Sequence, residues 1–124
     1  MKATSNAIQW AREFFALIDA GDGDSVAGRV AIDAVLTSGN GTPVVGRDSI
    51  RATLDAFHSS VTSISHDVVR AWRVDEAYIV ELQITYVRTD GGTVVLPCVN
   101  ILDVDDHGLI TKYQIFMDIS PVFA

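Results

Sequence analysis

The stretch Ser63–Asp118 decides the fold, and it reads SISHDVVRAWRVDEAYIVELQITYVRTDGGTVVLPCVNILDVDDHGLITKYQIFMD. Three short turn-like segments, at 74–76, 89–92 and 105–108, divide it into four stretches rich in Val, Ile, Thr and Tyr. This composition is typical of β-strands. Connections as short as these join strands that are antiparallel neighbours. The sequence therefore predicts four consecutive long strands in one sheet.

The residues before this stretch have the periodicity of helices. Apolar side chains recur at three- and four-residue intervals in the first turns, at Ala7, Trp10, Ala11, Phe14, Phe15 and Ile18. This spacing predicts an amphipathic helix. Thr4, Ser5 or Asn6 is expected to cap its start, and Gly21 its end. A second, short helix over 25–29 is predicted, with Asp24 as its cap.

A strand and a third helix are predicted between these two helices and the long strands. The strand covers 34–38 and ends in the turn signal 39–43. Asp48 is expected to cap the helix that follows. Its buried stripe is formed by Ile50, Leu54, Phe57 and Val61. The predicted element order is thus ααβαββββ.

Residues 1–124 are predicted to form a single α+β domain, because this length is close to the commonest domain size. Long strands twist and curl, and three helices cannot cover both faces of such a sheet. We therefore expect a cone-shaped barrel in which N-terminal helices pack on a strongly curved mixed, mainly antiparallel sheet around a pocket. Apolar residues on the convex face predict a homodimer.

Composition disfavours several classes of partner. The net charge is −7, and no basic stripe is present, so neither nucleic acid nor an anionic membrane is expected as a partner. No run approaches the length of a membrane span, and the lack of export features suggests a cytoplasmic protein. Cys98 is the single cysteine, so no intramolecular disulfide forms. No metal-ligand spacing or phosphate-binding loop is seen, so neither a metal nor a cofactor is expected.

The segments 14–22, 33–36, 45–50 and 108–118 together have an order and spacing that are fairly specific. In these residues the chain resembles the SnoaL-like branch of the nuclear transport factor two-like superfamily. The resemblance covers nearly the whole chain and implies an open cone with an internal pocket. Such proteins include steroid isomerases, polyketide cyclases, epoxide hydrolases, dehydratases and non-catalytic binding modules, so the fold alone leaves the function open.

The residues of this chain can be compared with the catalytic residues of each kind of enzyme in the superfamily. Aligned with the ketosteroid isomerases, the three catalytic positions hold Phe14, Ser38 and Val99, none of which can perform the required step. The catalytic aspartate of limonene-type epoxide hydrolases falls at Ile115, and their Arg-x-Asp pair has no counterpart in 81–85. Both activities are therefore rejected.

Asp118 matches the acid/base aspartate of the polyketide cyclases, and the resemblance makes it the candidate proton shuttle. If its side chain points inward, desolvation should raise its pKa; otherwise it is a strand-end carboxylate that caps a loop. His66 is the second catalytic candidate, either as a proton carrier in the pocket or as a surface or core histidine. His58 and His107 are expected to be solvated.

Seven further residues are candidates for substrate binding. Tyr86 shares a strand face with Leu82 and Ile84, while Glu81 lies on the opposite face, and a register error of one residue would exchange them. Asn100 either binds a ligand or faces a second subunit. Asn40 either borders the pocket mouth or is a turn residue with positive φ. Apolar wall or core is expected at Trp10, Phe14 and Leu36.

Three functions remain open from these patterns. The first is a cofactor-free enzyme that cyclises, isomerises or hydrates a small, largely apolar oxygenated metabolite, with Asp118 moving a proton. The second is a protein that binds such a ligand without chemistry. The third is a dimeric interaction module whose interior is filled by side chains.

Overall fold

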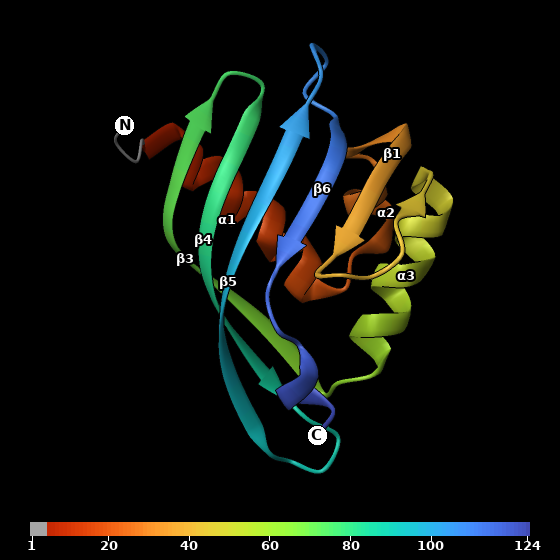
Figure 1. Cartoon of the computed structure of the whole chain (residues 1–124), viewed down its shortest axis with the longest axis vertical. Coiled ribbons are helices and arrows are strands. Elements are labelled where there is room, and N and C mark those ends of the chain that lie inside the picture. Colours follow the sequence, from red (N-terminus) through yellow and green to blue (C-terminus); the bar gives the residue numbers. More distant parts are fainter. Residues whose placement is uncertain (1–4) are drawn as a thin grey trace.

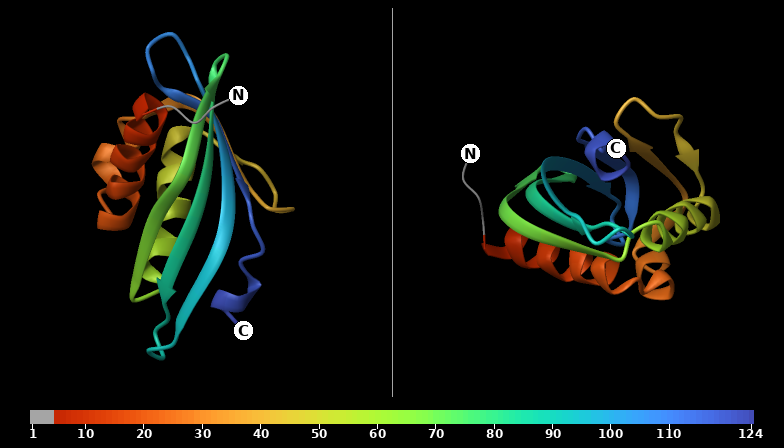
Figure 2. Two further views of the ribbon diagram at one scale, coloured as in Figure 1. Left: turned by 90° about the vertical axis from the view of Figure 1, so that its left-hand side faces the viewer. Right: turned by 90° about the horizontal axis from the view of Figure 1, so that it is seen from below.

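The computed structural model describes residues 5–124, which form three helices packed on one face of a six-stranded sheet (Figures 1 and 2). The helices are α1 (Ser5–Ala20), α2 (Gly23–Ala27) and α3 (Arg47–Ser59). The strands are β1 (Val30–Ser38), β2 (Val44–Val45), β3 (Ser63–Val74), β4 (Ala77–Val87), β5 (Thr93–Val104) and β6 (Ile110–Phe116). A 3₁₀ turn, Ser120–Val122, follows the last strand.

The strands lie in the order β2-β1-β6-β5-β4-β3. The four long strands β3 to β6 form the antiparallel meander that the turn signals predict, and β1 adds to β6 in parallel. The sheet is therefore mixed and mainly antiparallel, as expected. It curls without closing, with the helices on its concave side (Figure 2). The predicted α+β cone is confirmed.

The boundary between α1 and α2 differs from the prediction in one cap. Gly21 ends α1 with φ of +68°, and the Asp22 amide donates to the Leu17 carbonyl at 3.2 Å, as in a glycine-terminated helix. Asp22, rather than Asp24, caps α2, because its carboxylate accepts from the Ser25 amide at 3.2 Å. The side chain of Asp24 instead pairs with Arg51 of α3.

Two other boundaries also differ. The residue before α3 is Gly46, with φ of +97° and no side-chain cap, so Asp48 lies in the first turn and is not the cap. The two-residue strand β2 was not predicted, and β1 begins four residues earlier than expected. Thr4, one of the three candidate caps for α1, lies outside the described residues.

The core lies between α1 and the concave face, where every second residue of the strands points inward. On β4 the inward residues are Leu82, Ile84 and Tyr86, each with at most 2% of its surface exposed. The face that carries these residues is therefore the inward one, which settles a choice that the sequence had left open. Glu81 faces outward and pairs with Arg70 of β3.

Phe14 and Trp10, two of the predicted ligand-binding residues, belong to the packing of α1 on the sheet. Phe14 is completely buried and makes an edge contact with Tyr113, with ring centroids 5.8 Å apart. Trp10 stacks on Tyr78 of β4 at 3.9 Å. Neither residue lines the cavity described below, so for both the core interpretation holds and the binding interpretation is wrong.

Replacing Phe14 with alanine should therefore lower the free energy of unfolding by about 3 to 5 kcal/mol, because a buried ring is removed from a packed core. Ile32→Ala is the matched control: Ile32 is 75% exposed, and we expect a change of about 0.5 kcal/mol or less. Urea unfolding followed by circular dichroism measures both. Equal losses would show that the placement of Phe14 is wrong.

Candidate functional site

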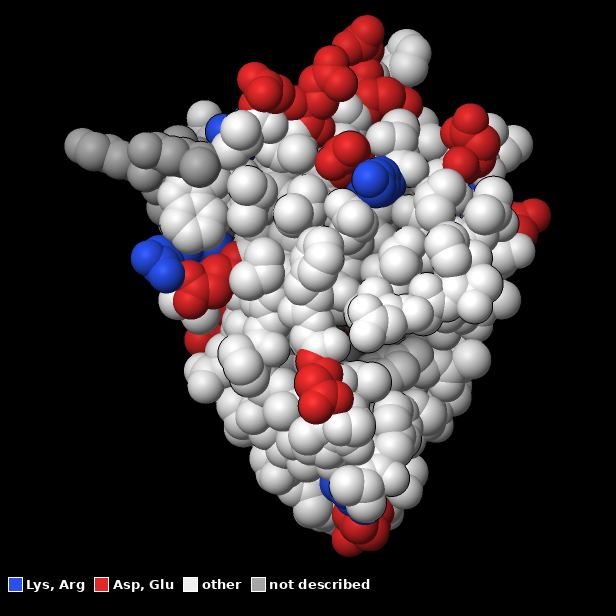
Figure 3. All heavy atoms as spheres, viewed as in Figure 1, with Lys and Arg blue, Asp and Glu red and all other residues white. Residues whose placement is uncertain are grey.

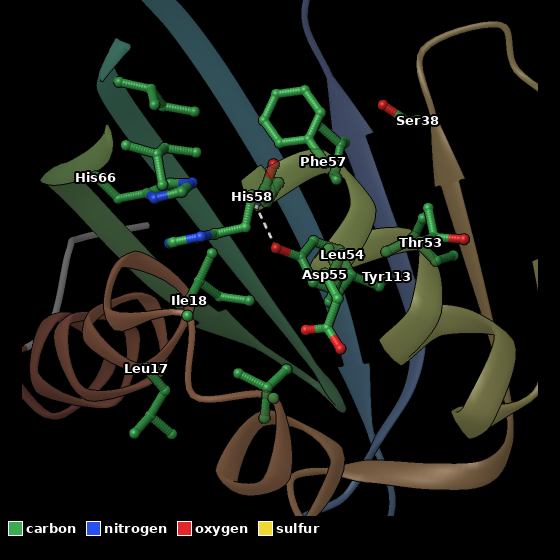
Figure 4. A pocket seen from close by; sticks show the side chains of 18 of the residues that line it. Leu17, Ile18, Ser38, Thr53, Leu54, Asp55, Phe57, His58, His66 and Tyr113 are labelled. Atoms are coloured by element: carbon green, nitrogen blue, oxygen red, sulfur yellow. Dashed lines mark hydrogen bonds between the residues drawn. The ribbon is translucent and has the colours of Figure 1, made fainter. Parts of the chain in front are cut away.

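A cavity of about 140 Å³ opens between the concave face of the sheet and helices α1 to α3. Figure 4 shows side chains from all of these elements converging on it. Its walls are mostly apolar and include Ile18, Leu36, Leu54, Phe57, Ile64, Ile84, Ile115 and Met117. Leu36, expected as apolar wall or core, lines the cavity. The interior is thus not filled by side chains, as an interaction module with a packed core would require.

His66 lies in this cavity and is held by Asp19 of α1. The Asp19 carboxylate accepts two bonds from one residue: His66 Nδ1 at 2.5 Å and the His66 backbone amide at 2.8 Å. Phe15 stacks on the imidazole, with ring centroids 4.8 Å apart. Because Nδ1 donates its proton to Asp19, Nε2 of a neutral His66 is left as a proton acceptor. This is the arrangement of an oriented general base.

A second imidazole, His58 of α3, also lines the cavity (Figure 4). It contacts Asp19 as well. Its Nε2 lies 3.2 Å from the Asp19 backbone oxygen. A carbonyl oxygen only accepts, so Nε2 carries the proton of a neutral His58 and Nδ1 is the acceptor. The expectation that His58 is solvated is therefore wrong, whereas His107 is exposed in the 105–108 turn as expected.

A small polar cluster is built into the sheet wall of the cavity. Asn100 is 1% exposed; its Oδ1 accepts from the Cys98 thiol at 3.2 Å, and its Nδ2 lies 3.5 Å from the Tyr113 hydroxyl. The Tyr86 hydroxyl lies 3.6 Å from the Met117 sulfur. Burial raises the pKa of Cys98 to about 12 and raises the pKa values of Tyr86 and Tyr113 above their ordinary range. All three groups are therefore neutral hydrogen-bond donors at neutral pH.

Charged side chains are confined to the edge of the cavity, where α2 and α3 meet. Asp22, Arg51 and Asp55 line it and are partly or fully exposed. Arg51 pairs with Asp24 of α2 and lies 3.5 Å from Asp55. These residues mark the mouth of the cavity, and a ligand passing them leaves water for an apolar interior.

Asp118, the residue carried over from the polyketide cyclases, does not line the cavity. It lies beyond the end of β6 at Phe116, and it is exposed. Its carboxylate accepts from the Ser120 amide at 3.0 Å. Hydrogen bonds from the Ser120 side chain and backbone lower the pKa of Asp118, where the catalytic role needs it raised. The catalytic prediction for Asp118 is wrong, and its alternative as a loop cap is correct.

Two other sequence-based assignments also change. Glu81 is on the outer face in its ion pair, and Asn40 is exposed in a turn where Gly39, not Asn40, has the positive φ. Neither lines the cavity. Val99, aligned with an isomerase acid, is 37% exposed, because Cys98 and Asn100 on either side of it face inward. Asn100 and Tyr86 line the cavity.

The sequence analysis missed Asp19, His58 and Tyr113, although two of them carry a readable signal. Asp19 is a carboxylate in the last turn of a helix, where the helix dipole disfavours negative charge. His58 lies four residues after Leu54, on the predicted buried stripe of α3. Tyr113 alternates with Ile115, and only the three-dimensional register shows that both reach the cavity.

Two further searches cover residues 5–124. No group of three or more His, Cys, Asp or Glu residues in this range is placed to hold a metal ion. No helix in the same range is long and apolar enough to cross a membrane.

The fold and the cavity define the class: a cone-shaped α+β pocket protein with the nuclear transport factor two-like fold. The chain belongs to the SnoaL-like family, since the model of the SnoaL-like domain matches residues 11–113. No curated protein matches.

Solved structures share the fold at low sequence identity. A candidate SnoaL-like polyketide cyclase from Shewanella denitrificans has 16% identity and a TM-score of 0.82, over 94% of this chain and 93% of that one. An epoxide hydrolase of the LEH-like type from M. tuberculosis has 20% identity and a TM-score of 0.79, over 97% and 88%. A Burkholderia pseudomallei NTF2-like protein of unknown function has 16% identity and a TM-score of 0.83, over 97% and 96%.

The buried thiol of Cys98 should make stability sensitive to alkaline pH. Its pKa is raised from 9.0 to about 12, so above pH 9 the unfolded chain loses this proton while the folded chain keeps it. The contribution of this thiol to the free energy of unfolding is therefore fully present below pH 9 and is lost as the pH rises toward 12. Between pH 8 and pH 10 the free energy of unfolding should fall by about 1 kcal/mol less in Cys98→Ala than in the natural chain. Urea unfolding at both pH values checks this, and equal falls would contradict it.

Proposed function

We propose that the protein is a cofactor-free acid/base enzyme in which His66, oriented by Asp19, takes a proton from a small, largely apolar carbonyl compound. The observation that carries this proposal is the Asp19–His66 pair at the wall of an open apolar cavity. The doubly bound carboxylate fixes the tautomer that leaves Nε2 as a base. Cyclase and epoxide hydrolase relatives among the fold neighbours are compatible with such chemistry.

The mechanism follows from the geometry of the pair. His66 Nε2 removes a proton from a carbon next to the carbonyl, and the positive charge that forms on the imidazole lies 2.5 Å from Asp19. Attraction between these charges stabilises the imidazolium in surroundings where water is scarce. The same proton can then be returned to a different atom, which is an isomerisation, or be used in ring closure or loss of water.

The cavity limits the substrate to a compact molecule. An apolar cavity of about 150 Å³ in another protein accepts benzene, so about 140 Å³ suits a ligand of about that size. The charged residues stay at the mouth, which disfavours a substrate with several charged groups. The proposed ligand is therefore a compact ring compound with few oxygen atoms.

Exchange of the α-protons of 2-indanone in D₂O tests the base directly, because it needs no knowledge of the natural substrate. Proton NMR should show exchange accelerated by the protein. His66→Gln should reduce this acceleration roughly 100-fold or more, since it removes the base. Asp19→Asn should reduce it roughly tenfold or more, since it removes the group that fixes the tautomer.

The matched control is His107→Gln, because His107 is an exposed histidine outside the cavity. Its exchange rate should equal that of the natural chain. Acceleration that survives His66→Gln would remove His66 as the base. Binding of 2-indanone with no accelerated exchange would support a non-catalytic binding protein instead.

A homodimer through the outer face of the sheet is a second part of this proposal. Val95, Val99 and Phe116 are 48%, 37% and 49% exposed, and Val99 is directly paired with Phe116 across β5 and β6. Figure 3 shows that this face carries few charged side chains, while acidic ones gather at its upper edge. Two copies with a net charge of −7 repel each other least across such a charge-poor face.

Val99→Lys should convert a dimer into a monomer, because it would bury two unpaired ammonium groups across a two-fold interface. Ile32→Lys, at an exposed apolar residue beside the start of α3, is the control and should remain dimeric. Light scattering coupled to size exclusion gives the mass of each. A monomeric natural chain would rule out the dimer.

A further inference from the structure

The residues of α3 that line the cavity lie on two different flanks of that helix. Successive residues of an α-helix are turned by about 100°, so Arg51, Asp55 and His58 share one flank, which faces α1 and α2. Thr53 and Phe57 also line the cavity, and the same geometry places them on the other flank. The cavity therefore passes beneath α3 and reaches both sides of it.

On this other side the cavity reaches the surface at a place that we call the second opening. It is formed by Ser38 at the end of β1, by Thr53 and Phe57 of α3, and by Met117 and Ile119 after β6. The first two of these residues are exposed, and the other three are half-buried. Figure 3 shows the surface hollowed between the end of β6 and α3.

The charged mouth and the second opening differ in what they can accept. Among residues 5–124, the Asp, Glu, Lys and Arg side chains that line the cavity are Asp22, Arg51 and Asp55, and all three lie at the mouth between α2 and α3. Asp118 is close to the second opening in the chain, but its carboxylate accepts from the Ser120 amide and does not line the cavity. A neutral apolar group can therefore occupy the second opening without displacing water from a charge.

Phe57 forms a wall that is shared by the interior and the second opening. Its ring makes edge contacts with Tyr86 and Phe123, each with ring centroids 5.9 Å apart. Tyr86 is buried in the cavity wall, whereas Phe123 is 55% exposed. The aromatic surface thus continues from the buried part of the cavity to the outside.

The path from the proposed base to the second opening is longer than one small ring. His66 is on β3 and Ser38 is on β1, and four strand spacings separate these strands. At about 4.8 Å each, these make about 19 Å along the sheet, which the curl shortens. Figure 4 shows Ser38 and Thr53 on the opposite side of Phe57 from His66. A volume of about 140 Å³ spread over such a path is narrow, so its far part suits a chain better than a second ring.

We infer that the substrate carries a neutral apolar chain, so that its carbonyl-bearing ring lies beside His66 and its chain passes beneath α3 into the second opening. The inference rests on the proposed function for the position of the ring. The site for the chain depends only on the shape and charge of the cavity, and binding alone tests it.

The experiment compares 4-methylcyclohexanone with 4-pentylcyclohexanone, which differ by four methylene groups. Titration followed by NMR gives both affinities. Each methylene removed from water strengthens binding about fourfold, so burial of two of the four should make the pentyl compound bind about fifteenfold more tightly. Nuclear Overhauser contacts locate the chain without any variant. The terminal methyl of the pentyl group should contact the side chains of Met117 and Ile119 and not that of Ile18, which lines the cavity on α1.

Ser38→Trp and Thr53→Trp each place an indole at the second opening. Each should reduce the advantage of the pentyl compound to about threefold or less and leave the affinity for 4-methylcyclohexanone within about twofold. Ala52→Trp is the matched control, because Ala52 is an exposed residue of α3 outside the cavity, and it should keep the full advantage. Thermal unfolding confirms that each variant is folded.

Three results would overturn the chain site. They are equal affinities for the two ketones, contacts of the terminal methyl with Ile18 in place of Met117 and Ile119, and an advantage that survives both Ser38→Trp and Thr53→Trp. The proposed base is judged separately. If His66→Gln keeps the advantage of the pentyl compound while the natural chain does not accelerate exchange of 2-indanone, the chain site is retained and the base is rejected.

Discussion

The two-residue alternation of side chains along β3 to β6 is the constraint on which the rest of this structure depends. Each of these strands has one face against the helices and one face away from them, so its register decides which chemistry reaches the cavity. Tyr86 and Asn100 are inside and Glu81 and Val99 are outside for this reason alone. A slip of one residue would place a carboxylate inside and the donors outside. The fold and the site are therefore set by the same pattern.

Asp19 connects this sheet to the helical layer. One carboxylate binds both the backbone and the ring of His66, so it fixes α1 against β3 and orients the imidazole in a single set of contacts. His58 of α3 reaches the carbonyl of the same residue. Three elements far apart in the chain thus meet at one turn of α1. This explains why a carboxylate is kept at a helix end that the dipole disfavours.

The sequence predicted the fold well because local signals agree with the global arrangement. The turns at 74–76, 89–92 and 105–108, the apolar stripe of α1 and the glycine that ends it all coincide with the structure. The two faces of β4 were also predictable from the period of the strand, but which of them points inward was not. The errors concern single residues. One is which aspartate caps α2, and the other is which residue of the turn after β1 has the positive φ.

The catalytic candidates were harder to predict, and the physical reason differs from residue to residue. Asp118 was inferred by family position, but the strand ends at Phe116 and the chain turns into a 3₁₀ segment, which brings Ser120 to the carboxylate and directs it to solvent. His66 was predicted from its residue type and strand position, yet its partner lies 47 residues away in the chain, so no spacing rule could find the pair.

The pair formed by the Asp19 carboxylate and the His66 imidazole sets the charge at the wall of the apolar cavity. A lone carboxylate would lose hydration on burial, and Asp19 recovers part of that loss from the two His66 donors. This leaves the cavity electrostatically biased toward positive charge on the imidazole and against any anion in the resting state. In the proposed reaction an enolate forms only as His66 gains its proton, when the Asp19–His66 pair carries no net charge.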